Sequence, residues 1–527
     1  MSGIHSVRVL GMAAALLAAG IIGPLPANAD SGGSRITSVT ISSTQPIGTF
    51  NGAAYVRLVG TLSGVVDGRE RVAGLAGPVP YTAQFELVTA APGQPRSDGV
   101  VVEAENRGSP LVLDSVQDFG LITGPPSTVA YPAGFGNGFL QNNGLAWARV
   151  QWQGPNGVNP AINPTIPLTA QGVGEVIVRD FGLLLRGRGA DLGLPTYRTA
   201  LLVGVSQSAW FVNTFVAEGF NAAPGRLPGQ VFVGAYTQDG VGNWLAINQL
   251  NAARGAPAQN PYVQQDGVPL RPDELLRRPL TDPFLVDTTA YTDFYRVRAS
   301  VWNTAHLPAG VREYNLPVAH SSAAGLAPGT PPTAVNCAIG GTPIPGLNPL
   351  DGRPFTRAAI LGLARRAGVR GLRGPAPVLA RSTRFRLTPG PDGPVPDQGN
   401  PNLPLFNPLP GVRLLVPRVN ADNQPVGGPS TFPAVTFPDV AFTLGVPAPV
   451  SVPPVGTRSI ADTCGNFGGW RAFTTSQLAA RYGTADQYVA AYAPVLDRLI
   501  ERGYVLGSDR AGILAFVRSR FSAAPVG

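Results

Sequence analysis

The N-terminal part of the chain carries hydrophobic positions spaced as in β-strands. Apolar and β-branched residues nearly alternate with polar ones over Arg35–Ile41 and Tyr55–Val66, a pattern typical of strands with one face in the core. The pattern continues over Tyr81–Val88 and Gly99–Glu103. We therefore expect antiparallel strands at one edge of a sheet.

From about residue 145 the pattern changes, and short apolar runs alternate with amphipathic stretches. Such alternation is typical of βαβ units, which build a largely parallel sheet with helices on both faces. The predicted strands are Leu145–Trp152, Thr199–Val205, Val231–Tyr236, Phe284–Val286 and Val311–Leu316, and the predicted helices are Gly174–Leu185 and Ala209–Glu218. The sequence thus predicts an α/β fold.

The C-terminal part divides into a Pro/Gly-rich segment and a helical segment. We expect residues 30–325 to form the first part of the core, and residues 326–460 to be an insertion or cap with one helix over Phe355–Arg366. Whether that insertion covers a site or hangs loosely stays open. Residues 461–527 are predicted to be helical and to pack on the core. Thr484 and Gln487 have the spacing of a capping box at the start of a helix. Pro494, which lies inside that predicted helix, is expected to kink it.

The N-terminus reads as a secretion signal. Arg8 precedes an apolar run, and Ala27–Ala29 supplies the small residues that signal peptidase accepts. We expect residues 1–29 to be removed and the protein to be secreted or associated with the cell envelope; a membrane anchor is the alternative. No later segment is predicted to span a membrane. Export favours a disulfide between the two cysteines, Cys337 and Cys464, with two free buried thiols as the other possibility.

Composition narrows the chemistry. The net charge of +8 comes entirely from arginine, because the chain has no lysine, which excludes a phosphate-loop lysine, a Schiff base and a Ser/Lys dyad. The arginines are scattered, so no nucleic-acid partner is expected. The three histidines are His5, His306 and His320, and neither an HExxH motif nor paired CxxC spacing is present. We therefore expect no metal and no cofactor.

Ser206 is the strongest candidate for a reactive residue. The apolar run Leu201–Val205 leads into this serine, Gly204 lies two positions before it, and Ser208 lies two positions after it, at the start of a predicted helix. A strand, a tight turn with small neighbours and a helix together form the setting of a nucleophile elbow. The alternative is that Ser206 only caps the helix.

A serine hydroxyl needs a base, and the base needs an acid to orient it. His320 follows a predicted strand late in the chain and is the expected base, whereas His306 is expected to cap a helix. The acid should lie between Ser206 and His320, at the end of a strand. Asp293 is the first choice, Asp287 the second and Asp239 the third; each is also compatible with an ordinary turn carboxylate.

Two backbone amides should bind the oxyanion that forms during acyl transfer. One is expected from Gln207, the residue after the candidate nucleophile. The other is expected from Arg107 or Gly108, in the turn that follows the strand Gly99–Glu103. Gly108 is also compatible with a plain turn glycine.

These residues give the chain a resemblance to bacterial secreted α/β-hydrolase domain proteins, a serine-esterase-like family. The similarity rests on Glu105–Gly108, Trp152–Gly154, the Gly204–Ser208 elbow, Glu218–Asn221 and a late histidine, and extends over most of the mature chain. It implies an α/β-hydrolase fold and a Ser-His-Asp triad. The chain departs from the pattern at Ala209 and Trp210, where the family usually has Gly-Arg, and at Tyr291, where it often has Glu.

The function that follows is that of a secreted serine hydrolase for small or polymeric carboxylic esters. An amidase or peptidase of the same fold is one alternative, and an exported binding protein with a vestigial site is another. We also expect Trp147, Trp152 and Trp210, together with the Pro-rich segment, to line an apolar pocket for the acyl group. The sequence leaves the substrate and the oligomeric state open.

Overall fold

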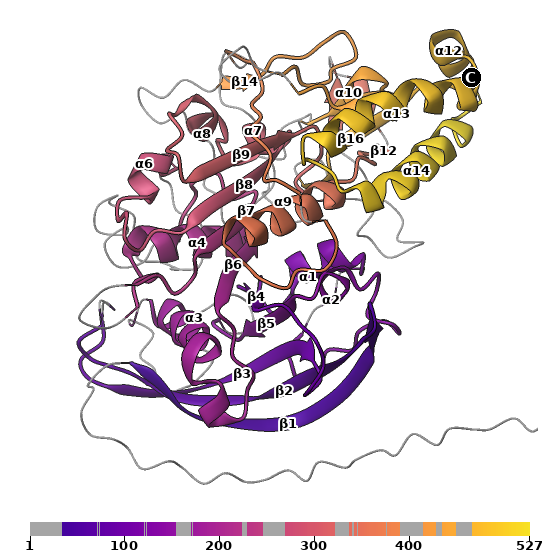
Figure 1. Ribbon diagram of the computed structural model, residues 1–527. Coiled ribbons are helices and arrows are strands. Elements are labelled where there is room, and N and C mark those ends of the chain that lie inside the picture. The colour runs from indigo at the N-terminus through magenta and orange to yellow at the C-terminus, as the bar shows by residue number, and fades with distance from the viewer. Residues whose placement is uncertain are drawn as a thin grey trace, which may run out of the picture.

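A computed structural model (Figure 1) describes most of the chain beyond its N-terminus. The described residues are 34–70, 72, 74–120, 122, 124–153, 170, 172–223, 229–245, 269–321, 337–339, 342–344, 346–375, 377–389, 415–427, 435–449 and 466–526. Residues 1–29 and Cys464 lie outside them, as do several stretches of residues 326–460, so the predicted signal peptide and disulfide remain predictions. Among the described helices, none combines the length and the hydrophobicity that crossing a bilayer requires.

A twisted sheet of nine strands runs through the described part of the molecule, in the order β1-β2-β3-β5-β4-β6-β7-β8-β9. Three neighbouring pairs are antiparallel, namely β1 with β2, β2 with β3, and β3 with β5. All the following pairs, from β5 with β4 to β8 with β9, are parallel. The strands are β1 (Arg35–Phe50), β2 (Ala53–Val66), β3 (Val79–Ala90), β4 (Gly99–Glu103), β5 (Ala146–Val150), β6 (Thr199–Val205), β7 (Gly234–Gln238), β8 (Phe284–Ala290) and β9 (Val311–Leu316). The predicted α/β class with N-terminal antiparallel strands is confirmed.

Helices cover both faces of the sheet. One core contains buried side chains of α3 and α4 together with the aromatic residues of α7 and α8, and the other contains those of α1, α2 and α9. The helices up to residue 304 are α1 (Leu111–Gln117), α2 (Phe139–Asn142), α3 (Val173–Leu183), a π-helical turn (Leu184–Arg188), a 3-10 turn (Ala190–Leu192), α4 (Gln207–Glu218), α6 (Pro272–Leu275), α7 (Asp293–Arg296) and α8 (Ser300–Thr304). The central parallel strands are therefore buried on both sides, which is why they read as apolar runs.

The C-terminal part returns to the sheet and then extends beyond it. Helix α9 (Arg353–Arg366) packs on β7, β8 and α1, so the segment predicted as an insertion contributes one helix to the main core. The rest of this part consists of small antiparallel sheets of two or three strands and of further helices, several of which Figure 1 labels. They are β10 (Cys337–Ile339), β11 (Thr342–Ile344), β12 (Gly346–Leu347), β13 (Leu387–Pro389), β14 (Leu415–Pro417), α10 (Pro438–Ala441), β15 (Gly445–Ala448), β16 (Gly469–Ala472), α12 (Thr475–Tyr482), α13 (Ala485–Glu501), a 3-10 turn (Gly507–Asp509) and α14 (Arg510–Ser522).

The helix boundaries in this part follow local capping chemistry. Thr484 Oγ1 accepts from the amide of Gln487, and the Gln487 side chain accepts from the amide of Thr484, so the predicted capping box is confirmed. The same arrangement begins α12 at Thr474. Pro494 lies inside α13, which continues as one helix from Ala485 to Glu501.

Candidate active site

The candidate residues lie at the carboxyl ends of four neighbouring strands. Ser206 directly follows β6, Asp239 directly follows β7, Asp293 comes three residues after β8, and His320 comes four residues after β9. Because these strands are parallel and adjacent, their carboxyl ends meet at one edge of the sheet. The fold thus brings together residues that are more than 100 positions apart in the chain.

Ser206 lies in a strained turn between β6 and α4. Its φ of 55° and ψ of −119° fall in a region that costs a non-glycine residue about 1–3 kcal/mol. Gly204 is required for this turn, since a Cβ on it would lie 2.4 Å from the Ser208 carbonyl oxygen. The Ser208 hydroxyl accepts from the amide of Val205 and donates to its carbonyl, each at 2.9 Å. A serine in place of the usual second glycine therefore braces the turn.

His320 connects the serine to a carboxylate. Its Nε2 lies 3.1 Å from Ser206 Oγ and its Nδ1 lies 2.8 Å from Asp293 Oδ1. The ring is buried, and the backbone amide of His320 donates to Thr292 Oγ1 at 2.8 Å. His306, the other histidine among the described residues, is exposed after α8. The structure thus places His320, and not His306, beside the serine.

The three candidate acids have different surroundings. Asp293 contacts the His320 ring, and its second oxygen accepts from the amide of Ala290 at 3.0 Å. Asp287 is engaged elsewhere, with Thr237 Oγ1 at 2.7 Å, Thr289 Oγ1 at 2.8 Å and the amide of Val241. Burial raises the pKa of Asp287 to about 7. It therefore supports the turn after β7 and does not touch the imidazole.

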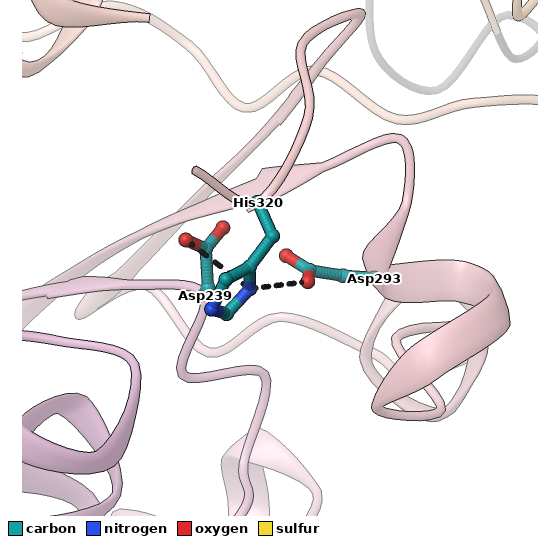
Figure 2. Close-up of side chains that lie close together, drawn as sticks. All are labelled: Asp239, Asp293 and His320. Atoms are coloured by element: carbon teal, nitrogen blue, oxygen red, sulfur yellow. Dashed lines mark hydrogen bonds and ion pairs between the residues drawn. The ribbon is translucent and has the colours of Figure 1, made fainter. Parts of the chain in front are cut away.

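Asp239 is the third acid, and the structure brings it to the same imidazole. Its Oδ2 lies 3.5 Å from His320 Nδ1 (Figure 2). The backbone of Asp239 is left-handed, with φ of 59°, and its amide donates to the Thr288 carbonyl at 2.7 Å. One histidine nitrogen therefore faces carboxyl groups from two consecutive strands.

The two carboxyl groups beside His320 have opposite electrostatic tendencies. Burial and then the Asp293 charge raise the pKa of Asp239 well above its ordinary value. Burial would also raise the pKa of Asp293, but the His320 charge and hydrogen bonds from His320 and Asp239 hold that pKa below its ordinary value. Burial and repulsion by Asp293 thus favour the neutral form of Asp239, and the contact with His320 favours the anionic form of Asp293.

The turn predicted to hold the oxyanion approaches the serine through Asn106. Arg107 and Gly108 have φ of 51° and 85°, and reciprocal backbone hydrogen bonds between Asn106 and Ser109 close the turn. Left-handed conformation at both central positions is typical of a type I′ turn. Asn106 Nδ2 donates to the Val205 carbonyl at 3.0 Å, which ties this turn to the residue before Ser206. The role of Asn106 was not predicted from the sequence.

Buried charged residues bind the backbone of the Arg107–Gly108 turn. Arg149, which is fully buried, donates through Nη1 to the Gly108 carbonyl at 2.9 Å and pairs with Glu105 at 3.3 Å and Glu86 at 2.9 Å. The indole of Trp152 donates to the Glu105 carbonyl at 2.8 Å. Because buried side chains bind the carbonyls of Glu105 and Gly108 on either side of Arg107, the backbone of this turn is held in one orientation.

A cavity of about 180 Å³ adjoins His320 and Asp239. Leu111, Phe119, Leu316 and Val318 form apolar walls, and Arg353 lies at its border, paired with Asp351 at 2.7 Å and Asp118 at 3.2 Å. The expectation that three tryptophans line such a pocket is wrong. Trp147, Trp152 and Trp210 are buried in the two cores, where their large rings stabilise helix–sheet packing.

Asp239, Asp293 and His320 also have the composition of a small metal site. Their ligand atoms lie within 4.8 Å of one another, and all three residues are buried. However, His320 Nδ1 already binds Asp293 and its Nε2 faces Ser206. The contacts of the described residues therefore fit proton transfer to and from a serine, with the imidazole as the carrier.

Comparisons with known proteins agree with this architecture. Residues 138–515 match the family model described as "Alpha/beta hydrolase domain". Comparison with curated proteins gave no match.

Among solved structures, the chain is similar to a glucuronoyl esterase from Solibacter usitatus, with 10% identity, coverage of 53% of this chain and 80% of that one, and a TM-score of 0.29. It is also similar to esterase B from Lactobacillus rhamnosis, with 10% identity, coverage of 44% and 69%, and a TM-score of 0.24. A third is prolyl oligopeptidase B from Galerina marginata, with 10% identity, coverage of 49% and 36%, and a TM-score of 0.24. At such scores the likeness carries no information on substrates.

Proposed function

The chain belongs to the α/β-hydrolase domain family, and on this premise we propose that it is a serine hydrolase that cleaves carboxylic esters through an acyl-enzyme. The observation that supports this proposal best is the continuous path from Ser206 Oγ to His320 Nε2 at 3.1 Å and from His320 Nδ1 to Asp293 Oδ1 at 2.8 Å. A serine held only as a helix cap needs no imidazole at hydrogen-bond distance.

In the proposed first half-reaction, His320 Nε2 takes the proton of Ser206 while Oγ attacks the ester carbonyl. The carbonyl oxygen becomes an oxyanion, which accepts hydrogen bonds from the amide of Gln207 and from the Arg107–Gly108 turn. Each such donor typically contributes about 10²–10³ in rate. The imidazolium then protonates the alcohol oxygen, the C–O bond breaks, and the acyl group stays on Ser206.

In the second half-reaction, water replaces the alcohol. His320 Nε2 removes a proton from that water as its oxygen attacks the acyl carbon, and the imidazolium returns the proton to Ser206 Oγ. The products are the free acid and the restored serine. Throughout both steps Asp293 keeps Nδ1 protonated, so that Nε2 is the nitrogen that takes up and returns each proton.

The location of the substrate is part of the proposal. The N-terminal residues read as a secretion signal, so we propose that the protein acts outside the cytoplasm or at the cell envelope. The cavity beside His320 has room for a compact group attached to the ester carbonyl.

Parallel assays on p-nitrophenyl acetate and on the corresponding p-nitroanilide separate the esterase from an amidase. We expect turnover of the ester and little of the anilide; the two substrates share the acyl group and differ in the leaving group, p-nitrophenol in the ester and p-nitroaniline in the anilide. A fluorophosphonate probe should label Ser206 stoichiometrically, because only an activated serine reacts with it. Faster anilide cleavage would favour the peptidase alternative, and unlabelled folded protein would favour a binding role.

Replacing Asn106 by alanine should lower kcat for p-nitrophenyl acetate by roughly 10- to 100-fold, part of the value of one oxyanion donor. The substitution removes the bond from Asn106 Nδ2 to the Val205 carbonyl and frees the Arg107–Gly108 turn to move from the serine. KM should change little, because this turn acts on the oxyanion. Asn137→Ala, which removes a similar side-chain bond to the Val116 carbonyl, is the control. Equal kcat in the two variants would contradict the role of Asn106.

A further inference from the structure

Two carboxyl groups meet one imidazole nitrogen in this site. Asp293 Oδ1 lies 2.8 Å and Asp239 Oδ2 lies 3.5 Å from His320 Nδ1, and Figure 2 shows the ring between the two side chains. The carboxyl groups come from the ends of β8 and β7, and both are buried. A triad of this kind needs only one acid, so the second one requires an explanation.

Electrostatics restrict how these groups are charged. Two carboxylates in contact inside a protein repel strongly, and such pairs retain one proton between them. Here burial adds to the repulsion, and the Asp287 charge acts on Asp239 in the same direction. The nearest fixed cation at the cavity, Arg353, is already paired with Asp351 and Asp118. Asp114 of α1 and Gln238 of β7 also line this cavity, and neither is a cation.

We propose that Asp239 and Asp293 work as one unit with a single proton, in which neutral Asp239 positions anionic Asp293 and can replace it as the partner of His320. This inference rests on the proposed function, and it assigns a positioning residue to the same reaction. The geometry favours the proton on Asp239, because Asp293 has the shorter contact to Nδ1 and also accepts from the amide of Ala290.

The unit gives the reaction a constant negative charge. When His320 takes the serine proton, the imidazolium is balanced by one negative charge on the pair, and the shared proton does not leave it. In the proposed unit, protonated Asp239 donates a hydrogen bond to Asp293 and so limits the rotation of that carboxylate. The left-handed backbone at Asp239 and the bond from its amide to the Thr288 carbonyl fix the position of Asp239 itself.

The same geometry makes Asp239 a reserve acid. If Asp293 is removed, Asp239 loses its closest like charge, so it ionises more readily. Its Oδ2 then needs to move by less than 1 Å from its 3.5 Å distance to reach a normal hydrogen bond with Nδ1. A single substitution at Asp293 should therefore cost much less activity than the removal of both acids.

The test compares Asp239→Asn, Asp293→Ala and the double variant Asp239→Asn/Asp293→Ala on p-nitrophenyl acetate. Asp239→Asn keeps a neutral donor and should retain kcat within about 3-fold. Asp293→Ala should lose roughly 10- to 100-fold, and the double variant roughly 10⁴-fold, the usual loss when a triad has no acid. A loss for Asp293→Ala as large as that of the double variant would overturn the proposal.

A second readout follows the His320 ring directly. The chain contains three histidines, so NMR of protein with ¹³C-labelled histidine resolves the pKa of each ring, with His306 as the internal reference. We expect the pKa of His320 to stay nearly unchanged in Asp239→Asn, to change by less than about one unit in Asp293→Ala, and to fall by more than about one unit in the double variant. A fall of that size in Asp239→Asn alone would show that Asp239 is ionised, and would overturn the proposal.

The NMR readout does not depend on catalysis. If the wild-type protein hydrolyses no ester and binds no fluorophosphonate, the proposed function fails, while the pKa values of His320 still decide the carboxyl pair. Urea unfolding of each variant identifies any loss that comes from misfolding. A merely structural role of Asp239 predicts no difference in the His320 pKa between Asp293→Ala and the double variant, which would also overturn the proposal.

Discussion

Ser206→Ala is expected to lower kcat for ester hydrolysis by about 10⁶-fold, as in serine hydrolases whose triad acts as a unit. The Ser206 hydroxyl lies 3.1 Å from His320 Nε2, the nitrogen that would take its proton when the acyl-enzyme forms. Fold and stability should change little, and the strained φ of 55° is no easier for alanine. The measurement is steady-state turnover of p-nitrophenyl acetate with active-site titration, to exclude contaminating esterase.

The companion variant His320→Ala should lose about as much activity as Ser206→Ala, and the double variant should lose no more than either. This non-additivity is expected because the serine is nucleophilic only when the imidazole takes its proton. His306→Ala is the matched control: the side chain is exposed and lies outside the site, so its kcat should equal that of the wild type. Activity lost in His306→Ala but kept in His320→Ala would refute the assignment of the base.

Arg149→Met should destabilise the protein by about 3–5 kcal/mol, the usual effect of removing one partner of a buried ion pair. Arg149 is fully buried between Glu86 and Glu105, and it also supports the Gly108 and Gly124 carbonyls. Methionine fills much of the space but leaves these acceptors without their donor. Urea unfolding gives the free energy of unfolding.

The control for this substitution is Arg510→Met. Arg510 pairs with Asp497 at 2.6 Å, but these side chains are 43% and 41% exposed, and exposed pairs of this kind typically contribute less than about 1 kcal/mol. Burial, and not the number of charges, is therefore the variable that the comparison isolates. Equal unfolding free energies for the two variants would show that the Arg149 cluster has no structural role.

The pH dependence of Arg149→Met follows from Glu105. Burial raises the pKa of Glu105 to about 7 while the Arg149 charge lowers it, so removal of the arginine should raise that pKa further. A carboxyl with a raised pKa in the folded state destabilises the fold above its unfolded pKa, and the penalty grows until the folded pKa is passed. The variant should thus lose most stability at alkaline pH.

The sequence predicted best the strands that are apolar runs between turns. β4 and β6 match their predicted ranges to the residue, and every residue in them is buried. β9 also matches its predicted range, although it contains Arg312, Glu313 and Asn315. β8 was predicted to end at Val286 but continues to Ala290 through Asp287, Thr288 and Thr289. These polar residues are buried, and hydrogen bonds to side chains of the neighbouring strand β7 compensate Asp287 and Thr288 for the loss of water. A hydrophobicity pattern cannot indicate these hydrogen bonds. β7 begins at Gly234 and not at Val231, since Val231 and Phe232 pack in the core before the strand starts.

Some residues of the candidate site could be predicted from local sequence and others could not. Ser206 and His320 are marked by local context, namely a strand-turn-helix junction and a scarcity of histidine. The acid is not, because Asp239, Asp287 and Asp293 each follow a predicted strand, and only their contacts in the folded structure separate them. The contribution of Asp239 as a second carboxyl depends on β7 and β8 being neighbours. The side chains of Ser208, Asn106 and Thr292 hold the site through hydrogen bonds to backbone groups. Because every residue has these backbone groups, the sequence does not indicate which of them is bound.

The shape of the edge strand β1 affects whether molecules of this protein can aggregate through their sheets. Its pairing with β2 shifts register between Ile36 and Ser38, between Ile41 and Ser43, and between Pro46 and Gly48. Each shift bends the strand, and Pro46 lacks an amide proton, so the open rim cannot offer a regular row of donors and acceptors to another chain. Straightening this strand, for example by deleting one bulge residue, would supply a template for sheet-to-sheet aggregation.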